Sequence, residues 1–229
     1  CSLINFFSPD IGRPHFKEQS IQALVLEPFK SFFSKEAAFA LLGIIFLYKL
    51  GDAFAGRLTT TFLIRGLGFS LTDVGAVNKG LGLMASIIGG LYGGVLMYRL
   101  GLYRSLVLFA WLQALTNFGF YILAILGASY VGLVAVIGLE NLAGGMGTAA
   151  FVALLMSVCD RRYTATQFAI LSAVASLGRV FAGPPSGFLV ENLGWSTFFA
   201  FTVVISLPVI YLLAQFRTVV EDHDRSEPI

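Results

Sequence analysis

Charged residues, cysteines and histidines are all scarce in this sequence. Asp, Glu, Lys and Arg make up 12% of its 229 residues, against about 25% in ordinary soluble domains. Its two cysteines, Cys1 and Cys159, are too few for a disulfide framework. The formal net charge of +2 is too small to indicate a polyanionic partner, so no nucleic acid is expected to bind. A Walker-type phosphate loop is also missing from the sequence, which argues against direct use of ATP.

Long apolar runs take the place of those residues. Hydrophobic residues make up 57% of the chain, and its mean hydropathy is +0.82. A water-soluble globule of this size needs more polar surface, so a lipid bilayer is predicted to surround the protein. The spans are predicted to be helices, because a lone strand cannot satisfy its backbone in lipid and a barrel would alternate over about ten residues. The six runs long enough to span a bilayer are 37–64, 74–98, 105–126, 130–158, 165–190 and 196–216.

The chain is predicted to divide into a cytoplasmic segment (1–36), a six-helix transmembrane domain (37–216) and a cytoplasmic tail (217–229). Residues 1–7 are apolar and lack the basic leader and cleavage site of a signal peptide. They look like the end of an upstream helix, which predicts that the chain is the C-terminal part of a longer protein. Residues 21–33 are predicted to be an amphipathic helix on the bilayer surface. Its expected lipid side holds Leu24, Phe29, Phe32 and Phe33, and its water side holds Glu27, Lys30 and Lys35.

Lysines and arginines are distributed unevenly between the two ends of the predicted spans. Ten fall on the side that holds both ends of the chain, Arg65 alone lies in the opposite loops, and four lie within spans. Cytoplasmic loops carry the excess of Lys and Arg in multi-pass proteins, so both chain ends are predicted to be cytoplasmic. The ten are Arg13, Lys17, Lys30, Lys35, Arg99, Arg104, Arg161, Arg162, Arg217 and Arg225.

Several polar residues lie within the predicted spans. Four positions of the first span recur at helical spacing and share one face, namely Lys49, Asp52, Gly56 and Thr60. A charge in lipid costs roughly 2.5–3.5 kcal/mol on insertion scales, so such residues usually mark function. They predict a polar, water-filled cavity shared by the first, second and fourth spans. The other polar residues at depth are Arg57, Asn78, Lys79, Glu140, Asn141 and Arg179.

A structural interpretation of the same charges stays open. Lys49 would then pair with Asp52. Likewise, Glu140 would pair with Arg179, and both pairs would hold helices together, while Lys79 could snorkel to the interface. The cavity is favoured for the first span and Glu140, and the structural role is favoured for Arg179. Four cations within the spans face only two carboxylates, so an anion is the natural complement and an anionic solute is predicted.

A glycine-rich stretch at the end of the second span leads into a basic loop. Its residues Arg99, Gly101 and Arg104 resemble the cytoplasmic loop motif of the major facilitator superfamily, although Tyr98 stands where that motif has Asp. Anchoring by the positive-inside rule alone would also explain these arginines.

The fifth span contains a second motif. Gly183 and Pro184 resemble the antiporter-type Gly-Pro motif of the same superfamily, and proline bends a helix by removing a backbone donor. A kink that serves only packing is the alternative. Six helices with both ends inside fit one half of such a transporter, whose two halves face each other around a midplane site.

Longer stretches sharpen this resemblance. Between about residues 36 and 216, the sequence resembles the C-terminal half of AmpG-type muropeptide permeases. The resemblance implies proton symport of anhydromuropeptides (GlcNAc-anhydroMurNAc-peptides) across the bacterial inner membrane, for peptidoglycan recycling. It also implies a partner, the N-terminal half of the same transporter, and neither a cofactor nor a metal. The stretches that carry it are 47–66, 77–79, 140–151, 166–172 and 194–198.

Three other functions compete with this one. A different transporter of the superfamily could carry another large anionic solute, such as an acyl-CoA. An intramembrane enzyme would need a histidine, a cysteine pair or paired carboxylates at depth, but His15 and His223 both lie in the predicted cytoplasmic ends. A structural scaffold would not need buried charges.

A proton symporter needs a group at depth that changes its protonation. Only the two carboxylates Asp52 and Glu140 qualify within the spans. Glu140 is slightly favoured, because Lys49 is predicted to hold Asp52 ionised. Gly144 and Gly147 are expected to leave open space beside Glu140.

Overall fold

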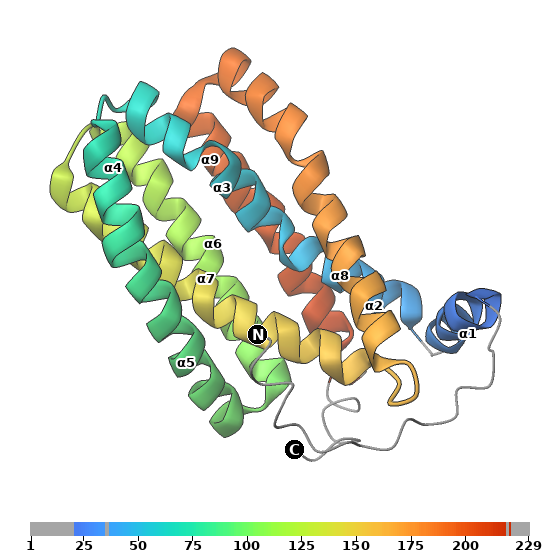
Figure 1. The fold of residues 1–229 in the computed structure, drawn as a ribbon. Helices are drawn as coiled ribbons and strands as arrows, with labels where there is room; N and C mark the ends of the chain where they lie inside the picture. The colour runs from blue at the N-terminus through green and yellow to red at the C-terminus, as the bar shows by residue number, and fades with distance from the viewer. Residues whose placement is uncertain (1–20, 35–36, 219, 221–229) are drawn as a thin grey trace, which may run out of the picture.

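The computed structural model describes residues 21–34, 37–218 and 220, and every element in these ranges is a helix. Figure 1 shows a bundle of long, roughly antiparallel helices, with one short helix, α1, at the side of one end. Predictions that concern residues 1–20, the side chain of Leu24, Lys35 and the tail beyond 220 lie outside the described residues.

The first two spans are each built from three helical segments. The first consists of α2 (Ala38–Tyr48), α3 (Leu50–Thr61) and a π-helical turn, η1 (Phe62–Gly66). The second consists of α4 (Leu71–Val77), a second π-helical turn, η2 (Asn78–Gly82), and α5 (Leu83–Leu100). The third and fourth spans are unbroken, as α6 (Leu102–Leu126) and α7 (Tyr130–Val158).

The last helical stretch holds two spans. It runs through α8 (Thr164–Phe181) and α9 (Gly183–Gln215), 52 residues in all. At 1.5 Å per residue it would be about 78 Å long, more than twice the hydrocarbon core of a bilayer. Gly194, with φ 79° and ψ 172°, breaks the helix, and the chain turns back there (Figure 1). The prediction of six membrane-spanning helices is confirmed.

Small residues let two spans approach closely. Helices α5 and α7 pack along much of their length. A Cβ added at Gly89 would meet the backbone carbonyl of Leu142, and one at Gly93 would lie 2.8 Å from Met146 Cα. Gly145 packs in the same way against the carbonyl of Ser86. Close backbone approach through glycine is the usual way in which membrane helices associate.

The bundle has two apolar cores, one toward each end. One is centred on fully buried aliphatic residues of α2, α6 and α7, such as Leu41, Leu106 and Leu154. The other is centred on aromatic residues, with Phe199 of α9 packed edge-on against Phe62 and stacked on Phe120. Between these two cores the lining of the bundle becomes polar.

The helix predicted for residues 21–33 is present as α1 (Ile21–Phe33), and it contacts α8 and α2. Phe29 and Phe33 are exposed, in agreement with a lipid-facing side. The prediction for Phe32 is wrong: its ring is 5% exposed and packs into the core, because α1 docks on the bundle through that face.

Candidate functional site

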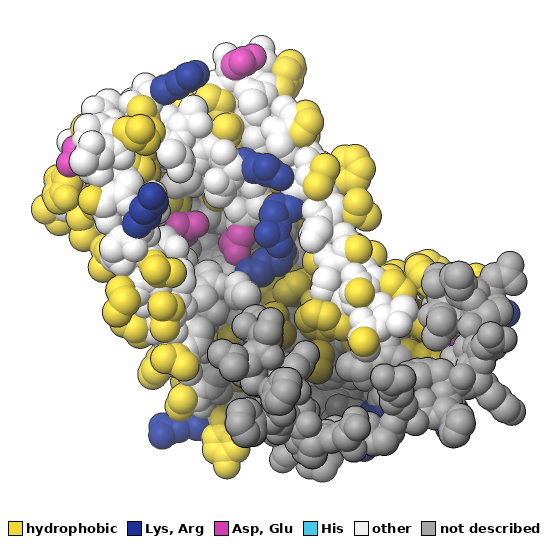
Figure 2. Space-filling view, viewed as in Figure 1, with side chains coloured by type: hydrophobic (Ala, Val, Ile, Leu, Met, Phe, Trp, Pro, Cys, Tyr) yellow, Lys and Arg dark blue, Asp and Glu magenta, His cyan; other side chains and the backbone are white. Residues whose placement is uncertain are grey.

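A hollow in one face of the bundle collects charged side chains. Figure 2 shows Lys and Arg next to Asp and Glu side chains in this hollow, with hydrophobic side chains on both flanks. The hollow contains a cavity of about 420 Å³ between the first span, α7 and α8, which we call the polar cavity. Its polar lining residues are Lys49, Asp52, Thr148, Ser172, Ser176 and Arg179, and its aromatic lining residues are Phe151 and Phe168.

Lys49 stands at the junction of α2 and α3, where its φ of −97° and ψ of −1° interrupt the helix. Its Nζ atom lies 3.5 Å from Asp52 Oδ2 and donates a 3.1 Å hydrogen bond to Thr148 Oγ1 on α7. Thr148 in turn donates to the carbonyl of Gly144 at 2.7 Å. The predicted Lys49–Asp52 pair is therefore formed. Its two side chains are 15% and 28% exposed, so the pair also faces the polar cavity.

Arg57 and Arg179 contact each other through side chain and backbone. Both Nε and Nη2 of Arg57 donate to the backbone carbonyl of Arg179, at 3.2 and 2.8 Å. The side chain of Arg179 is exposed and lines the polar cavity. The predicted pair between Arg179 and Glu140 is not formed, although the structure describes both residues. The side chain of Arg179 lines the polar cavity, whose lining does not include Glu140.

Glu140 lies on α7, half-buried, and interacts electrostatically with Asp52 and Lys49. Its carboxylate accepts a long hydrogen bond, 3.5 Å, from the neighbouring Asn141 amide. That amide also donates to the carbonyl of Ile137 at 2.9 Å. Glu140 is therefore held loosely, without a cation at ion-pair distance among the described residues.

The two glycines that follow Glu140 behave differently. Gly144 has open space beside it, as predicted. Gly147 does not, because a Cβ there would collide with the side-chain amide of Gln113 on α6. Helix α7 packs against both α5 and α6, and at Gly147 its surface lies against α6. The prediction of open space at Gly147 is wrong for that reason.

A second hollow of about 510 Å³ continues from the polar cavity toward α5. Both hollows share Thr148 and Val152, and the second is lined mainly by Ser86 and small residues of α5 and α7. Ser86 donates a 3.1 Å hydrogen bond to Asn141 Oδ1, which joins the two helices at its margin.

Asn78 and Lys79 open the π-helical turn η2. Such single π turns within α-helices occur frequently at functional sites. Lys79 is exposed and Asn78 is half-buried. The predicted residues that lie outside the lining of the polar cavity are Arg57, Thr60, Asn78, Lys79, Glu140 and Asn141.

The residues of the two short motifs stand at breaks between helices. Gly101 joins α5 to α6 with φ 81°, a conformation that favours glycine, and Arg99 and Arg104 flank it in exposed positions. Gly183 and Pro184 begin α9 directly after the break at Ala182. Proline suits that first turn, where its missing N–H has no partner to lose.

Thr148 is a site residue that the sequence analysis missed. It lies eight residues after Glu140 with Gly144 between them, so the three share a face of one helix. That spacing was available in the sequence, but a single threonine in an apolar span attracts little attention. Its contact with Lys49 depends on how α7 and the first span are rotated, which the sequence does not show.

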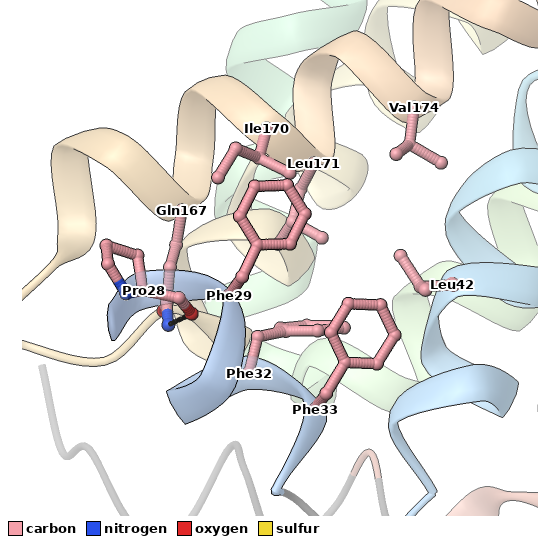
Figure 3. A pocket seen from close by; sticks show the side chains of 9 residues that line it. All are labelled: Pro28, Phe29, Phe32, Phe33, Leu42, Gln167, Ile170, Leu171 and Val174. Carbon is pink, nitrogen blue, oxygen red and sulfur yellow. Dashed lines mark hydrogen bonds between the residues drawn. The ribbon is translucent and has the colours of Figure 1, made fainter. Parts of the chain in front are cut away.

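Another pocket lies beneath α1, as Figure 3 shows. It measures about 50 Å³ and is lined almost entirely by apolar side chains. Its polar side chain, Gln167, is fully engaged: it donates to the carbonyl of Pro28 at 3.0 Å and accepts from the backbone N–H of Asp160 at 2.6 Å. This pocket therefore belongs to the packing of α1 and offers nothing to a charged solute.

Known proteins are similar to this chain along most of its length. The sequence profile of the Major Facilitator Superfamily matches residues 41–228. The chain is 50% identical over 221 residues to an anhydromuropeptide permease of Escherichia coli K12, covering 96% of this chain and 45% of that protein. It is 37% identical over 194 residues to putative transporter AmpG 4 of Rickettsia conorii, covering 85% of this chain and 47% of that protein.

A third relative, putative transporter AmpG 1 of Rickettsia prowazekii, is 34% identical over 205 residues, covering 86% of this chain and 46% of that protein. The chain spans about half the length of the curated relatives it matches. The resemblance to AmpG-type permeases is confirmed.

Proposed function

Because the chain belongs to the major facilitator superfamily, we propose that it forms the C-terminal half of a secondary transporter that imports anhydromuropeptides. The polar cavity is the observation that carries this proposal. It places Lys49, Asp52 and Arg179 together within membrane-spanning helices, where charges are costly and therefore usually mark function. In this superfamily the substrate site lies near the midplane, between two halves.

The chemistry of the cargo fits the cavity. Anhydromuropeptides carry peptide carboxylates, and the wall formed by the first span and α8 has more cations than carboxylates. Phe151 and Phe168 add aromatic surface beside the charges, which suits an amphipathic solute. An acyl-CoA would also present anionic groups. The relatives described above are named as an anhydromuropeptide permease or as AmpG transporters, which favours a muropeptide cargo.

Import is proposed to be coupled to protons, for recycling of peptidoglycan fragments. Glu140 is the proposed proton carrier and Asp52 is the second candidate. Both carboxylates lie within spans and interact with each other electrostatically, so a change of charge at one affects the other. Among the described residues, Asp52 has an ion-pair partner in Lys49 and Glu140 has none.

The proposed location is the bacterial inner membrane, with both chain ends in the cytoplasm and the N-terminal half of the transporter as partner. Single cysteines placed next to Ser70 and next to Gly127, in the loops opposite the chain ends, test the orientation. Membrane-impermeant maleimide should label both from the periplasm. Labelling only from the cytoplasm would overturn it.

Uptake of labelled GlcNAc-anhydroMurNAc-tripeptide into proteoliposomes tests the function itself. The full-length transporter should accumulate the label when the outside is acidified relative to the inside. A labelled acyl-CoA serves as the comparison. Uptake of muropeptide no faster than in protein-free liposomes would contradict the proposal.

A further inference from the structure

Two of the three cations on the wall between the first span and α8 already have protein partners. Lys49 is bound by Asp52 and Thr148, and the Arg57 guanidinium is bound by the backbone carbonyl of residue 179. The third, the guanidinium of Arg179, projects into the polar cavity and donates to no acceptor among the described residues.

The positive charge of Arg179 on this wall is therefore not balanced by a carboxylate of the described lining, and a bound anionic solute would balance it. Asp52 is the one carboxylate in the described lining, and Lys49 neutralises it. The hydrogen bonds from Arg57 also bring a second guanidinium up to the backbone of Arg179. A second positive charge on the same wall adds to the positive potential there, which favours a bound anion.

Two serine hydroxyl groups line the same cavity as the Arg179 guanidinium. Ser172 and Ser176 precede Arg179 by seven and three residues, so all three share the face of α8 that lines the cavity. Ser176 donates its own hydrogen to the carbonyl of Ser172 at 2.8 Å, which leaves its oxygen as an acceptor. A planar guanidinium beside an acceptor oxygen matches a carboxylate that has an amide N–H close by.

We propose that Arg179 binds a carboxylate of the cargo's peptide and that Ser176 accepts from the adjacent amide N–H, so the peptide end of the cargo lies against α8. This subsite rests on the proposed function and deepens it. It reassigns Arg179 from the structural role that the sequence suggested to a role in specificity.

Binding to the purified full-length transporter tests the subsite, with two probes. One is GlcNAc-anhydroMurNAc-tripeptide, and the other is the same molecule with its carboxylates converted to carboxamides. The variants are Arg179→Gln, which removes the charge, and Arg179→Lys, which keeps the charge but loses the planar fork. Arg65→Gln, an exposed arginine at the end of η1 and away from the cavity, is the matched control.

Arg179→Gln should weaken binding of the carboxylate probe roughly 10- to 100-fold, the usual range for losing a hydrogen bond to a charged group. Arg179→Lys should fall in between, and Arg65→Gln should bind like wild type. The carboxamide probe should bind wild type and Arg179→Gln equally.

Unchanged affinity of Arg179→Gln for the carboxylate probe, or an equal loss for both probes, would overturn the subsite while leaving the transporter assignment intact. Failure of the wild type to bind either probe would overturn the assignment itself and the subsite with it.

Discussion

Arg57 reaches from the first span to the fifth and donates two hydrogen bonds to the backbone carbonyl of Arg179. That carbonyl lies in the last turn of α8, three residues before the break at Ala182. The negative end of the helix dipole favours a cation there. Arg57 therefore fixes the first span to the fifth at the point where the fifth is interrupted.

Replacing Arg57 should reduce stability. We expect Arg57→Gln to lower the free energy of unfolding by about 1 kcal/mol, because an exposed hydrogen bond contributes in that range. Arg57→Lys should restore little, since lysine lacks the guanidinium fork. Thermal unfolding in detergent measures the effect, with Arg65→Gln as a control. Equal stability of Arg57→Gln and wild type would show that this contact does not hold the spans together.

Glu140→Gln should separate proton coupling from cargo movement. The amide has nearly the shape of the carboxylate but cannot release a proton, so accumulation driven by a proton gradient should be abolished. Exchange of labelled for unlabelled cargo should largely persist. Proteoliposome uptake with and without a pH gradient measures both. Normal accumulation by Glu140→Gln, together with its loss in Asp52→Asn, would assign the proton to Asp52 instead.

Two glycines of α5 offer a matched pair of substitutions. Gly89→Ala places a methyl group against the carbonyl of Leu142, whereas Gly94→Ala meets nothing within 4 Å. The first should cost about 1–3 kcal/mol through overpacking. The second should be neutral or slightly stabilising, because alanine favours helices. Unfolding temperatures of the two variants provide the comparison, and equal values would show that α5 and α7 pack less tightly than described.

Gln167 holds α1 on the bundle. Gln167→Ala leaves both the carbonyl of Pro28 and the N–H of Asp160 without this partner, at a cost of about 1–3 kcal/mol for buried groups. Hydrogen exchange in the described part of α1 should rise accordingly. Tyr163→Phe removes only an exposed hydrogen bond to Glu27 and should change exchange much less. The same exchange rate in Gln167→Ala as in wild type would contradict this role.

The hydroxyl of Tyr163 is predicted to lose its proton at a higher pH than an ordinary tyrosine, because its pKa is raised. Its 2.8 Å hydrogen bond to the Glu27 carboxylate raises the pKa of Tyr163. A raised pKa means that the contact is intact at neutral pH and is lost only as pH rises through that higher value. Glu27→Gln should lower the pKa toward the ordinary value. Absorbance titration, with Tyr163→Phe to identify the signal, measures the change.

Features that depend on one helix at a time could be predicted from the sequence. The spans follow from apolar length, and the Lys49–Asp52 pair follows from a spacing of three residues within one span. The break near Pro184 follows from the missing N–H of proline.

Features that depend on the rotation of one helix against another could not be predicted. Gly147 faces Gln113 instead of open space, and the side chain of Arg179 lines the polar cavity instead of pairing with Glu140. Phe32 is buried because α1 docks on the bundle, although its own amphipathic pattern fits lipid equally well. A sequence pattern states which residues share a face, but the neighbour of that face comes from tertiary packing.

The interruption of the first span falls on Lys49 itself, a residue that bears charge. Because Lys49 lies at the junction, a bend between α2 and α3 moves its ammonium group relative to α7. Thr148 on α7 and Asp52 on α3 both contact that ammonium group, and the angle between α2 and α3 sets the length of each contact. The angle of the first span and the position of the Lys49 charge in the polar cavity therefore change together.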